Sequence, residues 1–158
     1  MTETLKAGDK APDFELRAAG DKTVRLGDFH GKTLVLYFYP KDETPGCTKE
    51  ACSFRDAYQD FTDAGAEVIG VSADSVDSHK DFAAHHRIPF LLASDPSNVV
   101  RDRYGVRKTL GIFPGRVTFV IDGEGVIRHT FASQLRFNAH VGEALGVVRT
   151  LVGNRASA

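Results

Sequence analysis

Apolar residues follow two different periods along this chain, and the alternation between them predicts strands interleaved with helices. Continuous apolar runs are typical of strands covered on both faces, and the sequence has such runs at 34–39, 67–72, 90–93 and 117–121. Apolar residues at steps of three and four indicate helices. They occur at 48–64, from a Ser75 cap to about 87, in a short segment from Asp95 to Gly105, and at 139–152.

Two antiparallel hairpins complete the expected sheet. Residues 11–25 alternate apolar and polar side chains around a turn at 19–22, and a turn at 122–125 returns the chain along 126–131. We therefore predict an α/β fold with a mixed central β-sheet flanked by helices and an N-terminal β-hairpin. No repeat or linker interrupts the pattern, which favours a single domain over residues 1–158.

Composition narrows the function classes. The 158 residues carry a net charge of −1 and 42% hydrophobic residues, which is ordinary for a soluble domain and points to neither nucleic acid nor an anionic membrane. No apolar run approaches the roughly 20 residues of a membrane span, and the first residues have no apolar signal core. We expect a cytoplasmic protein without nucleic-acid or membrane partners. In a reducing compartment, its two cysteines favour a catalytic or redox role over a structural one.

Both cysteines lie just after the first long apolar strand. Pro40, Pro45 and Gly46 force a turn there, and Cys47 then falls on the first turn of the predicted helix. The free N–H groups and the dipole of a helix N-terminus favour an anion, so this position favours a thiolate and can hold a small polar substrate against it. Thr44 precedes Cys47 by three residues. A tight loop would bring its hydroxyl to the same point.

Cys52 follows five residues after Cys47 in the predicted helix. Ideal helix geometry separates the two Cα atoms by roughly 8.7 Å, whereas a disulfide tolerates about 7 Å. The two sulfur atoms therefore bond only if the first turn unwinds, as suits a pair that alternates between two states. Its position beside Ala51 predicts burial of Cys52 in the reduced protein.

Residue types alone leave other interpretations open. Thr44 by itself is a turn or cap residue, and Arg116 by itself is a solvated charge at the end of a strand. The six histidines show no metal-ligand spacing with the cysteines, so we expect no metal site. A protein dithiol–disulfide oxidoreductase usually carries Cys-x-x-Cys, which is absent here, and a non-enzymatic thiol redox sensor is a second alternative.

One segment closely resembles the active-site segment of the peroxiredoxins, and in particular of their Q-type, or bacterioferritin comigratory, group. It is residues 38–56, FYPKDETPGCTKEACSFRD. Further matching marks are at 11–14, 70–72, 92–95, 104–106 and 116–122. The resemblance covers nearly the whole chain. It implies a thioredoxin-like fold and a thiol peroxidase that acts on hydrogen peroxide and organic hydroperoxides.

The resemblance also implies the roles of the two thiols. Cys47 is expected to be the peroxidatic nucleophile, which a peroxide oxidises to a sulfenic acid. Cys52 is expected to resolve it as an intramolecular disulfide, which thioredoxin or a similar dithiol then reduces. No cofactor is implied. Because both thiols lie in one chain, we expect a monomer.

The remaining implied roles concern the peroxide pocket. The resemblance assigns Thr44 and Arg116 to peroxide binding and activation, and Pro40 to shielding the pocket. It assigns the backbone at Gly46 to donating hydrogen bonds. Glu50, one helical turn after the first cysteine, is expected to orient Arg116.

Overall fold

A single mixed sheet of seven strands organises the computed structural model, which describes residues 4–20, 22–106, 116–133 and 136–156. The strand order is β2-β1-β5-β4-β3-β6-β7. The strands are β1 (Glu15–Ala18), β2 (Lys22–Arg25), β3 (Thr33–Phe38), β4 (Ala66–Ser72), β5 (Leu91–Ser94), β6 (Val117–Ile121) and β7 (Ile127–Ala132). The helices are α1 (Pro45–Asp63), α2 (Val76–His86), α3 (Val99–Arg103) and α4 (Phe137–Ala156), with a 3-10 turn η1 (Leu26–Phe29).

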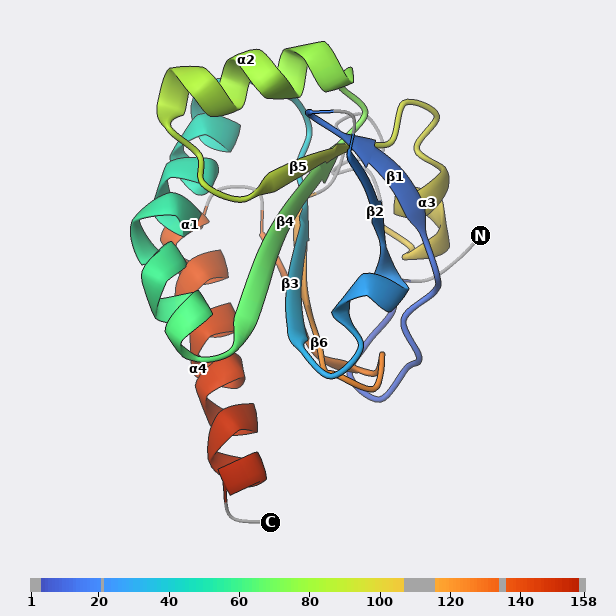
Figure 1. The fold of residues 1–158 in the computed structure, drawn as a ribbon, viewed down its shortest axis with the longest axis vertical. Helices are drawn as coiled ribbons and strands as arrows, with labels where there is room; N and C mark the ends of the chain where they lie inside the picture. Colours follow the sequence, from blue (N-terminus) through green and yellow to red (C-terminus); the bar gives the residue numbers. More distant parts are fainter. Residues whose placement is uncertain (1–3, 21, 107–115, 134–135, 157–158) are drawn as a thin grey trace.

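Side chains alternate between the two faces of the sheet and so build two hydrophobic layers. Along β3, Val35 and Tyr37 pack with apolar residues of α1, α2 and α4, while Leu36 and Phe38 pack with residues around α3 and the N-terminal hairpin. Figure 1 shows this division, with α1 and α4 on one side of the sheet and α3 on the other. The continuous apolar run of β3 is therefore explained by burial on both faces.

The predicted architecture is confirmed in its class and its hairpins. β1 pairs with β2, and β6 pairs with β7, both antiparallel. The predicted turn at 19–22 includes residue 21, which lies outside the described residues. Ser75 caps α2 as expected, because its hydroxyl accepts a hydrogen bond from the Ser78 amide. None of the described helices combines the length and apolar character that a membrane span requires.

The start of α1 differs from the prediction by three residues. The helix begins at Pro45, and Thr44 is its N-cap. Proline fits the first helical position because its missing N–H would have no partner there and its fixed φ already suits a helix. The pattern-based prediction treated Pro45 and Gly46 as turn residues, whereas they form the first turn itself. Cys47 consequently lies inside the helix, in its first turn.

The strand register places two distant segments at one end of the sheet. β3 runs antiparallel to β6, with Phe38 opposite Val117. The loop that leaves the C-terminal end of β3 and the residue that precedes β6 therefore meet at the same end of the sheet. This end of the sheet carries Cys47 and Arg116.

Candidate active site

Arg116 and Cys47 are in direct contact at this end of the sheet. The Arg116 Nη2 atom donates to Cys47 Sγ over 3.4 Å, although 69 residues separate the two in sequence. Cys47 is 1% exposed and Arg116 is 6% exposed, so the contact is shielded from bulk solvent. The guanidinium therefore places a positive charge directly beside the sulfur atom. Arg116 is therefore a buried partner of the sulfur and not a solvated charge at a strand end.

Glu50 binds the other side of the same guanidinium. Arg116 Nη1 donates to Glu50 Oε1 over 2.7 Å, and the Glu50 side chain is fully buried. Burial raises the pKa of Glu50 to about 7, although the adjacent Arg116 opposes this rise. Burial alone would lower the pKa of Arg116, but the nearby Glu50 and Cys47 hold it above its ordinary value, so Arg116 stays charged. The expected contact between Glu50 and Arg116 is present.

His140 of α4 completes this buried cluster and was not singled out from the sequence. Its Nε2 atom donates to the Ser133 carbonyl over 2.7 Å, and its Nδ1 atom lies 2.8 Å from the Thr118 hydroxyl. Burial lowers the pKa of His140 to about 4, so the ring is neutral near pH 7. Nδ1 lies 3.6 Å from Glu50 Oε2. Sequence spacing held no signal for this contact, because α4 meets α1 only in the folded chain.

The first turn of α1 presents backbone donors beside the sulfur. Thr48 is the first residue whose amide bonds back along the helix, to the Thr44 carbonyl. The amides of Gly46 and Cys47 precede it and have no acceptor within the helix. The Thr44 hydroxyl makes no capping bond to them, and donates instead to the Lys41 carbonyl over 2.8 Å. Its lone pairs therefore stay available to accept a hydrogen bond. Pro40, Thr44 and Gly46 are each half-buried.

A second buried network fixes the loop between β3 and α1. Asp42 accepts hydrogen bonds from the Tyr39 hydroxyl over 2.6 Å and from the Ser78 hydroxyl over 2.8 Å, and lies 2.7 Å from His79 Nδ1. Arg101 donates to the Tyr39 carbonyl over 2.9 Å. These contacts tie the loop to α2 and α3, and so set the position from which α1 starts.

Cys52 lies farther along the same helix. Both cysteines are free thiols, and α1 is continuous from Pro45 to Asp63, so the separation calculated for an intact helix applies to them. Cys52 is half-buried, in contrast to the predicted burial, and lines a surface hollow beside the start of α4 with Lys49 and Arg136. It is therefore accessible to a partner while Cys47 is enclosed.

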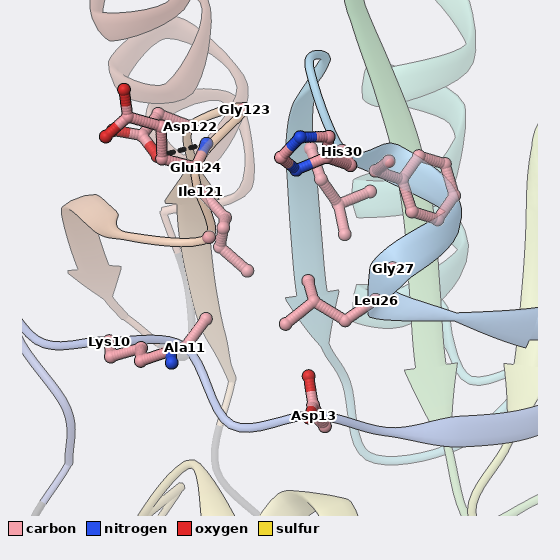
Figure 2. A pocket seen from close by; sticks show the side chains of 13 residues that line it. Lys10, Ala11, Asp13, Leu26, Gly27, His30, Ile121, Asp122, Gly123 and Glu124 are labelled. Carbon is pink, nitrogen blue, oxygen red and sulfur yellow. Dashed lines mark hydrogen bonds between the residues drawn. The ribbon is translucent and has the colours of Figure 1, made fainter.

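The hollow shown in Figure 2 lies at the opposite end of the sheet. It is lined by Leu34 at the start of β3 and Ile121 at the end of β6, with η1 and the β6–β7 turn around them. Its volume of about 150 Å³ is below the roughly 300 Å³ at which small-molecule sites begin. This hollow is therefore smaller than a typical small-molecule site.

A buried thiol in contact with a charged arginine, at the start of a helix that follows a central strand, is the arrangement expected of a thiol peroxidase. Comparisons with known proteins agree. Residues 7–130 match the model of the AhpC/TSA family. The wheat protein peroxiredoxin Q, chloroplastic (Triticum aestivum) is 50% identical over 148 residues, covering 93% of this chain and 68% of the relative. The Arabidopsis thaliana protein of the same name is 50% identical over 142 residues, covering 89% and 66%.

Solved structures show the same resemblance. Peroxidoxin BcpB of Mycobacterium tuberculosis has a TM-score of 0.85 at 37% identity, covering 93% of this chain and 98% of that one. A cysteine-to-serine mutant of PrxQ from Xylella fastidiosa has a TM-score of 0.86 at 30% identity, covering 95% and 99%. The chain belongs to the AhpC/TSA family, as a peroxiredoxin of the Q-type group with a thioredoxin-like fold.

Proposed function

We propose that Cys47 is the peroxidatic thiol and that its contact with Arg116 carries the activity. The thiolate attacks one oxygen of hydrogen peroxide or an organic hydroperoxide, forming an S–O bond as the O–O bond breaks. Cys47 becomes a sulfenic acid, and the other oxygen leaves as hydroxide or alkoxide and takes up a proton. The observation that best supports this proposal is the 3.4 Å contact between Arg116 Nη2 and Cys47 Sγ at a helix N-terminus.

The surrounding groups would stabilise charge where it forms on the leaving oxygen. Arg116 supplies a cation, and the amides of Gly46 and Cys47 supply two neutral donors. Thr44 already donates to a backbone carbonyl, so its hydroxyl would accept a hydrogen bond from the peroxide O–H. Pro40, at the start of the loop, would limit the entry of water. Glu50 would hold the guanidinium in place.

Resolution would then require part of α1 to open. The Cys52 thiol condenses with the sulfenic acid, forming an S–S bond and releasing water. Because an intact helix holds the two Cα atoms too far apart, the first turn must unwind before this step. A dithiol reductant such as thioredoxin would reduce the disulfide by exchange and leave with a disulfide of its own. Since both thiols belong to one helix, we propose that a monomer suffices.

Two cysteine variants test this division of roles. Cys47→Ser should abolish the reaction with peroxide. Cys52→Ser should still form a sulfenic acid, which dimedone trapping and mass spectrometry detect, but should lose turnover with thioredoxin and thioredoxin reductase. Equal loss of the first step in both variants would contradict the assignment. Stoichiometric oxidation of the unmodified protein without turnover would favour the redox sensor, and peroxide-independent exchange with protein disulfides would favour the oxidoreductase.

A further inference from the structure

An exposed cluster joins the catalytic loop to the end of α2. The Glu43 carboxylate lies 2.9 Å from His85 Nδ1 and 2.7 Å from His86 Nε2. One ligand atom from each residue lies within 4.8 Å of the other two. Glu43 is far from both histidines in sequence, so histidine spacing along the chain gives no indication of the cluster.

The donor set suits a borderline divalent cation. Zinc takes imidazole nitrogen and carboxylate oxygen at about 2.0–2.2 Å in a tetrahedral arrangement, which places the ligand atoms roughly 3.3 Å apart. Glu43 Oε1 lies 3.3 Å from His85 Nδ1 and 2.7 Å from His86 Nε2, and the ligand atoms of the three residues all lie within 4.8 Å of one another, so only small adjustments separate them from that value. The His85 and Glu43 side chains are 67% and 48% exposed, so they can adjust by small rotations. The same exposure leaves solvent to supply a fourth ligand.

A neighbouring group of potential metal ligands lacks this freedom. Asp42, Asp74 and His79 also bring ligand atoms together. There, however, the carboxylates accept hydrogen bonds from hydroxyl groups of Tyr39, Ser72 and Ser78, and His79 Nε2 is bonded to the Ala93 carbonyl. A cation would have to displace these buried bonds. In the exposed cluster of Glu43, His85 and His86, by contrast, the two histidine rings hydrogen-bond only to Glu43 within the described part of the chain.

We propose that Glu43, His85 and His86 form a site for a zinc-type divalent cation. Glu43 directly precedes Thr44, the N-cap of α1, so a bound cation would tether the start of the helix to α2. This consequence rests on the proposed function. The tether leaves Cys47 and Arg116 in place for peroxide attack, but opposes the unwinding that the Cys47–Cys52 bond requires. The cation therefore slows resolution and prolongs the life of the sulfenic acid.

The magnitude follows from linkage. A ligand that binds only the closed loop at about 100 times its dissociation constant lowers the open fraction roughly 100-fold. Disulfide formation that proceeds from the open state should slow by the same factor. Formation of the sulfenic acid, which uses the closed state, should keep its rate.

Zinc binding is tested first without the cysteines. Zinc sulfate is titrated calorimetrically into the full chain carrying Cys47→Ser and Cys52→Ser, so that thiols cannot contribute. We expect one equivalent of zinc to bind, with at least tenfold weaker affinity after His85→Ala or Glu43→Gln and unchanged affinity after His30→Ala, the control. Absence of stoichiometric binding, or equal affinity in His85→Ala, overturns the site. This experiment stands whether or not the chain reduces peroxide.

The tether is tested by single-turnover oxidation of the chain with both cysteines. Dimedone trapping follows the sulfenic acid, and intact mass follows the disulfide. Saturating zinc should slow disulfide formation in the wild type but not in His85→Ala, and should leave sulfenic acid formation unchanged. Equal slowing of disulfide formation in both proteins, or no slowing in either, overturns the tether. Slowing of the first step indicates zinc on Cys47 and also overturns it.

Discussion

Replacing Glu50 by glutamine should change how the stability of the fold depends on pH. Glutamine keeps the shape of the side chain and can still accept a hydrogen bond from Arg116, but it cannot ionise. In the native protein, burial raises the pKa of Glu50 from its ordinary 4.5 to about 7. The folded state therefore binds a proton that the unfolded state releases between these values. Wild-type stability falls as pH rises through this window, and the variant lacks that loss.

The expected size follows from the two pKa values. A difference of one pH unit corresponds to about 1.4 kcal/mol, so the interval from 4.5 to about 7 amounts to about 3 kcal/mol. Of this loss in stability, about 2 kcal/mol falls between pH 5 and pH 8. His140 acts in the opposite direction, because burial lowers its pKa to about 4 and the fold gains stability as pH rises toward 6.5. Its contribution is present in both proteins and cancels in their difference.

Urea unfolding at pH 5 and pH 8 measures the effect. Relative to the wild type, Glu50→Gln should become more stable by about 2 kcal/mol on moving from the lower to the higher pH. Glu124→Gln, which changes a carboxylate in the β6–β7 turn, is the control and should show no such change. A constant difference between Glu50→Gln and the wild type across this range would show that the Glu50 pKa is not raised by burial, and would refute the reasoning.

Two further substitutions test the site and the sheet. Arg116→Gln removes the cation beside Cys47 and should slow sulfenic acid formation by about 10²- to 10³-fold, the usual cost of losing one donor aimed at a transition state. Stopped-flow kinetics checks this, with Arg128→Gln as a control that retains the wild-type rate. Gly70→Ala should destabilise the fold by about 1–3 kcal/mol in urea unfolding. Its Cβ would lie 2.7 Å from the Tyr37 ring and 2.9 Å from Leu92, and unchanged stability would show that β4 shifts freely.

Most of the sheet and the position of the thiol could be predicted from the sequence, because local rules fix them. The apolar run of β3 and the spacing of α1 are properties of short segments, and both elements are confirmed. The start of α1 was placed too late because Pro45 suits both a turn and a first helical position, and the sequence alone does not distinguish them. The Arg116 contact came from the family resemblance. Composition and spacing gave only a strand-end charge.

Long-range contacts among polar side chains were beyond prediction. His140 reaches Glu50 because α4 packs on α1, and no pattern in either helix encodes that approach. The Glu43 cluster depends on a loop residue with φ of 62°, in a region where glycine is preferred and glutamate is uncommon. Nothing in the sequence predicts that Glu43 adopts this left-handed backbone conformation. Such contacts depend on how whole elements dock, so they emerge only from the fold.

The composition of the first turn of α1 reconciles the two demands on this helix. Under the proposed mechanism, peroxide attack uses the formed turn, in which the Gly46 and Cys47 amides have no acceptor within the helix, whereas resolution by Cys52 requires the turn to open. Its N-cap Thr44 makes no capping bond, which forgoes about 1 kcal/mol, and Gly46 costs up to about another 1 kcal/mol relative to alanine. Farther along, Phe54 and Phe61 are fully buried and anchor the rest of the helix. Under this mechanism, opening would be easiest at the turn that carries Cys47, and it would expose this buried residue while Phe54 and Phe61 stay packed.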